Sequence, residues 1–304
     1  MVSKSSRQAQ QRAREALEVQ RRTAKARRQR MTAAITAIVA VVVVVGTLVG
    51  VKVAGGGSHT AAAASGLAPA SMVTPLTTVP ATVLDQVGTG QVTTLPSLTT
   101  GQPMLTDGGK PLVVYVGAEY CPFCAAERWS MVQALSRFGT FSNLGQTHSS
   151  STDVFPNTAT LSFHGATYSS QYVAFQGVET TTNQPQGSGY APLDKPTAQQ
   201  QQLLDKYNAA PFVPASDAGS IPFVDLGNKA LVSGSSFSPQ LLAGKSADQI
   251  AAALSNPSDP IAKAVDGTAN ALTALLCQMT NGQPGNVCAT PAVTAYQSTL
   301  HVNN

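Results

Sequence analysis

The hydrophobic pattern of the chain is sharpest between residues 110 and 138. Residues 112–116 form an unbroken apolar run rich in β-branched side chains, which is typical of a strand buried on both faces. Directly after it, apolar positions recur at spacings of three and four, at Trp129, Val132, Leu135 and Phe138. The pattern therefore predicts a buried strand followed by a helix, with the Cys-Pro-Phe-Cys motif of residues 121–124 where one gives way to the other.

Further strands and helices are predicted towards the C-terminus. Ser246 and Gln249 match a capping box, and Asp259 before Pro260 is typical of a second helix start. Apolar spacing and turn residues place strands at 158–163 and 172–176, and helices at 197–207, 246–254, 259–277 and from Pro291 onwards.

A different pattern dominates the N-terminal part. Residues 32–51 carry no charge and are long enough to cross a hydrocarbon core of about 30 Å as a helix. Arginines precede this run and only Lys52 follows it, so the positive-inside rule predicts a cytoplasmic N-terminus and an extracytoplasmic C-terminal domain. We expect a transmembrane helix over 31–53 in the cell membrane. A cleaved signal peptide is the alternative, disfavoured by the length of the run and by a poor cleavage site before Gly55.

The charge of the chain is unevenly distributed. The net charge is +4, but residues 1–30 hold ten Lys or Arg against two Glu, whereas the remainder holds nine against thirteen Asp or Glu. A basic tail can bind nucleic acid or form a solvated helix. Because this one stands immediately before the apolar run, we interpret it as a cytoplasmic topology signal and expect no nucleic-acid partner.

Between the apolar run and the strand, the chain is rich in Gly, Ala, Ser, Thr and Pro and nearly uncharged. Residues 54–80 lack periodicity, so we expect a flexible linker there. Short apolar groups follow, and we expect the extracytoplasmic domain to occupy residues 81–304.

The placement of the two central cysteines has a chemical consequence. A helix N-terminus carries partial positive charge and free N–H groups, which favour the thiolate of Cys121 over its thiol. The thiolate is the nucleophile of disulfide exchange, and two cysteines three residues apart can also form a disulfide with each other. We therefore predict a redox couple of Cys121 and Cys124, with a structural disulfide as the alternative.

Two short windows resemble the thioredoxin superfamily. Residues 118–121 read Ala-Glu-Tyr-Cys, which resembles the Ala-Glu-Trp-Cys of thioredoxins, and the motif is close to the Cys-Pro-Tyr-Cys of glutaredoxins. Residues 219–222, Gly-Ser-Ile-Pro, resemble the superfamily's cis-proline loop, and residues 223–226 and 229–232, joined by Gly227-Asn228, resemble the hairpin that follows it. The resemblance implies a cis bond before Pro222 that faces Cys121. The implied catalytic residues are Cys121, Cys124 and Pro222, and the implied substrate-binding residues are Ile221, Tyr120, Pro122 and Phe123.

The whole layout resembles a family described as domain of unknown function 929, which has a membrane anchor, Cys-Pro-x-Cys, a long insertion and a C-terminal cysteine pair. This resemblance covers roughly residues 111–300 and implies no known substrate. Together the resemblances imply an α/β, thioredoxin-like fold preceded by a single transmembrane helix. An insertion of roughly 145–215 would separate the active-site helix from the cis-proline hairpin.

One position departs from the thioredoxin pattern. Tyr115 stands where thioredoxins have a buried Asp that assists proton transfer to the second cysteine. Glu119 and Glu127 are possible substitutes, and the sequence places neither of them.

Four cysteines in an extracytoplasmic domain predict two disulfides, for which three pairings exist. Local pairing is favoured: Cys121 with Cys124 as the redox pair, and Cys277 with Cys288 as a structural clamp on a Gly/Pro loop. The clamp would contribute about 2–3 kcal/mol in the chain-entropy model. A role of the second pair in electron relay is the alternative. Zinc is disfavoured because the two pairs have unlike spacings.

These observations predict a membrane-anchored thiol-disulfide oxidoreductase. Its substrates would be protein thiols or disulfides, a membrane redox partner would recycle it, and the couple needs no dissociable cofactor. Proline after the first cysteine resembles the more oxidising members of the superfamily, so an oxidase or isomerase is slightly favoured over a reductase. The alternative is a non-catalytic, thioredoxin-like envelope binding module with structural disulfides.

Overall fold

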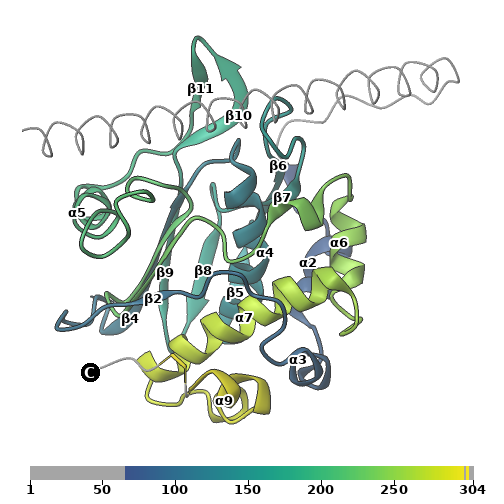
Figure 1. Ribbon diagram of the computed structural model, residues 1–304, viewed down its shortest axis with the longest axis vertical. Helices are drawn as coiled ribbons and strands as arrows, with labels where there is room; N and C mark the ends of the chain where they lie inside the picture. The colour runs from purple at the N-terminus through teal and green to yellow at the C-terminus, as the bar shows by residue number, and fades with distance from the viewer. Residues whose placement is uncertain (1–65, 298, 301–304) are drawn as a thin grey trace, which may run out of the picture. The chain divides into compact units, whose positions relative to one another are not determined.

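The computed structural model describes residues 66–297 and 299–300. Its main element is a mixed sheet in which β2, β13, β12, β4 and β3 are neighbours in that order, with β9 also paired to β4 (Figure 1). The strands of this sheet are β2 (Ser97–Leu98), β3 (Thr106–Asp107), β4 (Lys110–Gly117), β9 (Ala174–Glu179), β12 (Phe223–Leu226) and β13 (Ala230–Ser233). The protein is therefore a mixed α/β protein.

Strand β4 is the predicted central strand, and both of its faces are buried. It runs parallel to β9 and antiparallel to β12. Val113 and Tyr115 point into the larger hydrophobic core, whereas Leu112, Val114 and Val116 point into a second, smaller one. This alternation explains the unbroken apolar run, because a strand with helices on both faces has no side left for polar residues.

Helices cover both faces of this sheet. On the larger core lie α4 (Pro122–Ser136) and α7 (Pro260–Met279), which pack against each other, and on the smaller core lies α5 (Ala198–Tyr207) (Figure 1). The two predicted helix starts, at Ser246 and Asp259, are confirmed. Asp259 accepts a hydrogen bond from the Ile261 N–H, and Ser246 and Gln249 form a capping box at α6 (Ala247–Ala253).

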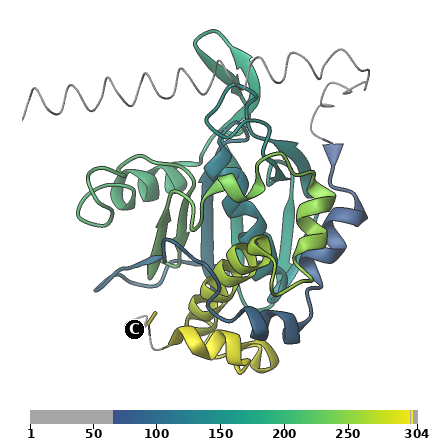
Figure 2. The same ribbon diagram turned by 45° about the vertical axis from the view of Figure 1, so that its right-hand side comes forward.

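The remaining helices lie around the larger core. They are α2 (Ala70–Thr77), α3 (Ala81–Val87), the 3₁₀-helix η1 (Pro239–Leu242), α8 (Gly285–Cys288) and α9 (Pro291–Gln297). Helix α2 packs beside α6, as Figure 2 shows at the edge of the domain. The predicted linker over 54–80 is therefore wrong in its last part. Met72 and Leu76 are fully buried, and this helical spacing of two apolar residues was hidden by the Ala, Pro and Thr residues around them.

The predicted insertion of 145–215 is not one separate unit. Its range includes β9 and α5, which belong to the central layers. The additional elements lie on either side of β9. Before it come β5 (Gly139–Ser142), β6 (Gly145–His148), β7 (Ala159–Ser162) and β8 (Thr167–Ser170), and after it the hairpin of β10 (Thr181–Gln186) and β11 (Gly189–Pro192). The short strand β1 (Gly66–Leu67) pairs with β6.

The predicted cytoplasmic tail of 1–30 and transmembrane helix of 31–53 lie outside the described residues. Within the described ranges, every helix is too short or too polar to cross a membrane.

Candidate active site

Cys121 occupies the N-cap of α4, at the exit from β4. Its backbone is extended, and its sulfur accepts a hydrogen bond from the Cys124 N–H at 3.3 Å. Pro122 follows at the first helical position, where a missing N–H costs nothing. Hydrogen bonding by the Cys124 side chain, and then by the Cys124 N–H, lowers the pKa of Cys121 even though the residue is largely buried. The helix start therefore favours a thiolate at Cys121.

Cys124 lies one turn into the same helix in a different environment. It is 0% exposed, against 5% for Cys121. Burial raises the pKa of the Cys124 thiol well above its ordinary value. Both residues are free thiols here, the reduced form of the predicted couple. The pair thus combines one thiol whose pKa is lowered with one buried thiol whose pKa is raised.

The predicted proline loop faces this pair. The Cys121 thiol lies 3.7 Å from the carbonyl oxygen of Ile221, to which it donates. The bond between Ile221 and Pro222 is cis, as the resemblance implied, and β12 starts at the next residue. Residues a hundred positions apart in the sequence are therefore in contact at one sulfur.

Aromatic side chains surround the cysteines. Tyr120 stacks on Tyr190 of β11 with ring centroids 4.2 Å apart, and Phe123, which is 38% exposed, meets Phe155 edge to face at 6.0 Å. Pro122, by contrast, is buried and offers little surface for contact. Sequence reasoning missed the two partner rings, because both come from the additional segments around β9, where the pattern is weak.

A buried ion pair lies in the same region of the core. Arg128 donates to both carboxylate oxygens of Glu179, at 2.6 and 2.8 Å, and also to the Ala118 carbonyl at 2.7 Å. Both side chains are 0% exposed, and the Arg128 guanidinium carbon lies 5.8 Å from the ring centre of Tyr115. Neither residue of this pair was predicted from the sequence. An arginine one turn after Cys124, within an apolar helix pattern, was the signal available.

The two glutamates considered as substitutes for the missing Asp are placed elsewhere. Glu127 accepts hydrogen bonds from the N–H and the hydroxyl of Ser236, and burial raises its pKa to about 7. Glu119 lines a cavity of about 210 Å³ together with His164. The charges that act on Cys124 are those of Cys121, Arg128 and Glu179. Among the carboxylates, it is therefore Glu179 whose charge raises the pKa of the Cys124 thiol.

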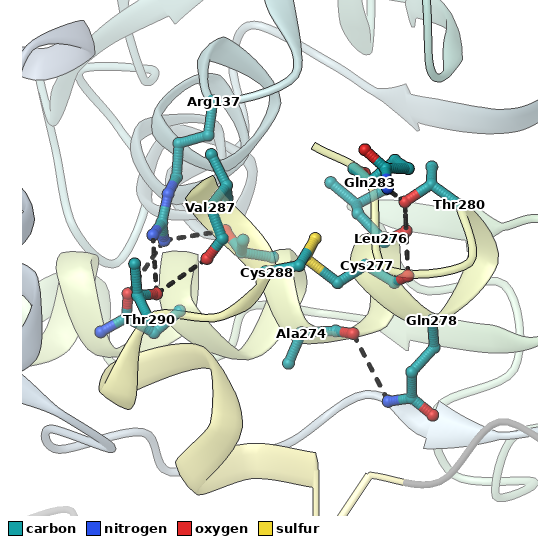
Figure 3. The surroundings of a disulfide bond; sticks show 12 residues. Arg137, Ala274, Leu276, Cys277, Gln278, Thr280, Gln283, Val287, Cys288 and Thr290 are labelled. Atoms are coloured by element: carbon teal, nitrogen blue, oxygen red, sulfur yellow. Dashed lines mark hydrogen bonds between the residues drawn. A yellow bond between two sulfur atoms is a disulfide. The ribbon is translucent and has the colours of Figure 1, made fainter. Parts of the chain in front are cut away.

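The second cysteine pair forms the disulfide that the sequence predicted. Cys277 and Cys288 join the end of α7 to α8, with an S–S distance of 2.01 Å (Figure 3). Arg137, the C-cap of α4, reaches the neighbouring Thr290 hydroxyl at 3.5 Å. Since α4 has 15 residues and is about 22 Å long, the disulfide lies near one end of this helix and Cys121 at the other. This separation argues against direct exchange between the two pairs.

Taken together, the described residues define a mixed α/β protein with a Cys-x-x-Cys motif at a helix start, facing a proline loop. A family model described as domain of unknown function (DUF929) matches residues 99–278, more than half of the chain, and the chain belongs to this family. The match includes both free cysteines and the proline loop. No curated protein and no solved structure matches the chain.

Proposed function

We propose that the protein is a thiol-disulfide oxidoreductase with a thioredoxin-like fold, acting through Cys121 and Cys124. The observation that carries the proposal is the arrangement at one sulfur. Cys121 accepts the Cys124 N–H at the start of α4 and at the same time lies against the Ile221 carbonyl. A helix start lowers the pKa of a thiol, and an exposed backbone edge beside it offers an extended peptide a place to pair.

The order of elements supports the thioredoxin-like part of the proposal. The central strand β4 leads into the cysteine helix α4, and the chain returns through β9 and α5 to the proline loop. The antiparallel hairpin of β12 and β13 follows that loop and pairs with β4. This is the arrangement that the two resembling sequence windows imply.

The chemistry is a two-step exchange. In the reducing direction the Cys121 thiolate attacks a substrate disulfide, one substrate sulfur leaves as a thiolate, and a mixed disulfide forms. Cys124 then attacks the Cys121 sulfur, which releases the second substrate sulfur and leaves a Cys121–Cys124 disulfide. In the oxidising direction the same steps run backwards and a substrate dithiol loses two electrons. We favour an oxidase or isomerase, because of the proline after Cys121.

The cellular setting is part of the proposal. We place the domain outside the cytoplasm, anchored to the cell membrane by residues 31–53, with protein thiols or disulfides as substrates. The exposed ring of Phe123 and the stacked ring of Tyr120 would contact residues beside the substrate cysteine. A membrane redox partner would restore the couple after each turnover.

Trapping of the mixed disulfide tests this function. The full-length chain with Cys124→Ala should accumulate a covalent adduct with a disulfide-containing protein substrate, because nothing can resolve the intermediate. The matched Cys121→Ala variant should accumulate none. If neither variant forms an adduct and the wild-type chain exchanges no disulfides, the protein is a binding module and the oxidoreductase proposal fails.

A further inference from the structure

The hydroxyl group of Tyr115 is buried and has no hydrogen-bond acceptor in the described residues. Tyr115 is 0% exposed, and within the described part of the chain its hydroxyl has no hydrogen-bond partner. Buried polar groups are nearly always paired, since an unpaired one costs about 1–3 kcal/mol. A hydroxyl left unpaired in one state of a protein is therefore a candidate for pairing in another state.

Gly117 lies between this hydroxyl and the sulfur of Cys124. Gly117 has no side chain, and a Cβ atom at that position would lie 2.2 Å from the Tyr115 hydroxyl oxygen and 3.0 Å from the Cys124 sulfur. The hydroxyl and the sulfur thus face the same point over a glycine. The O–H can rotate about its C–O bond towards this point.

Cys124 needs a donor whenever it carries negative charge. In the reducing direction it must become a thiolate to attack the mixed disulfide, and in the oxidising direction it leaves as one. Because Cys124 is fully buried, water cannot solvate that charge. The N–H at the helix start is already directed to Cys121, so the Cys124 sulfur has to be stabilised from another side.

The charged groups around this space are compatible with a buried thiolate. Helix α4 contributes Cys121 and Arg128, β9 contributes Glu179, and β4 contributes Tyr115 itself. Arg128 favours the charged form of Cys124, whereas Cys121 and Glu179 oppose it. Because the Arg128 charge is paired with Glu179, a hydrogen bond to the sulfur would add a stabilisation that this ion pair does not supply.

We propose that the Tyr115 hydroxyl donates a hydrogen bond to the Cys124 thiolate during disulfide exchange. This inference rests on the proposed function and assigns to Tyr115 the task of stabilising the second cysteine. In the exchange step the Cys124 proton ends on the departing substrate thiol, the Cys121–Cys124 bond forms, and the mixed disulfide breaks. Tyr115 keeps its own proton throughout.

The test compares Tyr115→Phe with Tyr168→Phe in the full-length chain. Tyr168 is a matched control, since its hydroxyl donates to the Leu135 carbonyl at 2.8 Å. In a Cys121→Ser background Cys124 is the free thiol of the domain, and its alkylation is followed against pH. Tyr115→Phe should reduce its thiolate fraction at a given pH about tenfold, the effect of one hydrogen bond to a charged group, and slow exchange by a similar factor in the otherwise unaltered chain. Tyr168→Phe should change neither quantity.

The melting temperature distinguishes a hydrogen bond from Tyr115 to Cys124 from a purely structural role of Tyr115. Tyr115→Phe removes a hydroxyl without a partner, so its melting temperature should equal or exceed that of the wild-type chain. An unchanged Cys124 titration, or a lowered melting temperature without a titration change, would overturn the inference while leaving the proposed function intact. If the titration moves as expected but the wild-type chain exchanges no disulfides, the hydrogen bond is supported and the proposed function is overturned.

Discussion

The two cysteine pairs of the domain lie near opposite ends of helix α4 and differ in their surroundings. At the N-terminal end Cys121 receives a helix N–H, and a buried ion pair and an unpaired tyrosine hydroxyl lie close by. Near the C-terminal end, Cys277 belongs to the last turn of another helix, α7, and its carbonyl accepts from the Gly282 N–H. Helix starts favour anions and helix ends disfavour them.

The difference indicates that the surroundings of a cysteine pair, rather than its spacing alone, decide whether the pair is reactive, as we propose for the first pair, or structural. Both pairs are close enough along the chain to form a local disulfide. The first pair faces the half-buried Ile221 loop, and the Cys124 N–H donates a hydrogen bond to the Cys121 sulfur. The second pair closes a turn between α7 and α8. It lies beside the half-buried Arg137, whose guanidinium donates to side-chain oxygens that include those of Asn270 and Thr273.

Replacing the first cysteine should have the largest effect. We expect Cys121→Ser to reduce disulfide exchange to the uncatalysed background, because no other thiolate faces the Ile221 loop. The folded state should be retained, since serine preserves the cap. Turnover of a disulfide-containing model protein, with circular dichroism as the folding control, measures both. Substantial residual exchange would mean that the second pair is also reactive.

The next largest effect should come from the buried ion pair. Glu179→Gln leaves the Arg128 charge without its counterion, so we expect the free energy of unfolding to fall by about 3–5 kcal/mol. The pKa of Cys124 should also decrease, because the Glu179 charge raises it. Denaturant unfolding and thiol titration measure the two changes. Glu127→Gln, at another buried glutamate that has no ion pair in the described residues, is the matched control and should cost less stability.

A pH effect follows from Glu127 itself. Burial raises its pKa from 4.5 to about 7 in the folded protein. The folded state therefore holds this proton more tightly, and the resulting stability is fully present below about pH 4.5 and is lost as the pH rises through about 7. We expect a loss of up to about 3 kcal/mol from this group.

Unfolding curves between pH 4 and pH 8 for the wild-type chain and Glu127→Gln measure this loss as a difference. The comparison is necessary because Asp225 and Asp266, whose pKa values burial raises to about 7, act in the same direction. Parallel pH profiles for the two chains would show that Glu127 does not contribute.

The smallest effect should belong to the second cysteine pair. Removing it with Cys277→Ser and Cys288→Ser should lower the free energy of unfolding by about 2–3 kcal/mol, because a short loop is no longer closed in the unfolded chain. The rate of exchange should remain that of the wild-type chain. A parallel loss of exchange activity at a temperature where the variant is folded would instead assign an electron-relay role to this pair.

The sequence predicted the parts of the fold that depend on local patterns. The buried strand β4, the cap at Cys121, the helix after Asp259 and the pairing of Cys277 with Cys288 each follow from neighbouring residues. Helix α2 was missed because only Met72 and Leu76 mark its buried face. The range of the insertion was wrong because β9 is half-exposed along much of its length, and its place beside β4 depends on a long-range pairing.

For the site, too, the residues that belong to local motifs were predicted and those that depend on long-range contacts were not. Cys121 and the Ile221 loop were identified from motifs that resemble known ones. The residues behind Cys124 were not, because contact between Arg128 and Glu179 joins a helix to a distant strand. Tyr115 was noticed only as a departure from a pattern, and its relation to Cys124 depends on the missing side chain of Gly117.

The most direct test of the central claim is the pH dependence of alkylation at each cysteine of the reduced, full-length chain, assigned by peptide mass spectrometry. We predict that Cys121 reacts first, with a midpoint below that of an ordinary thiol, and that Cys124 reacts only at higher pH. Equal midpoints near that of an ordinary thiol, or modification of Cys124 before Cys121, would contradict it.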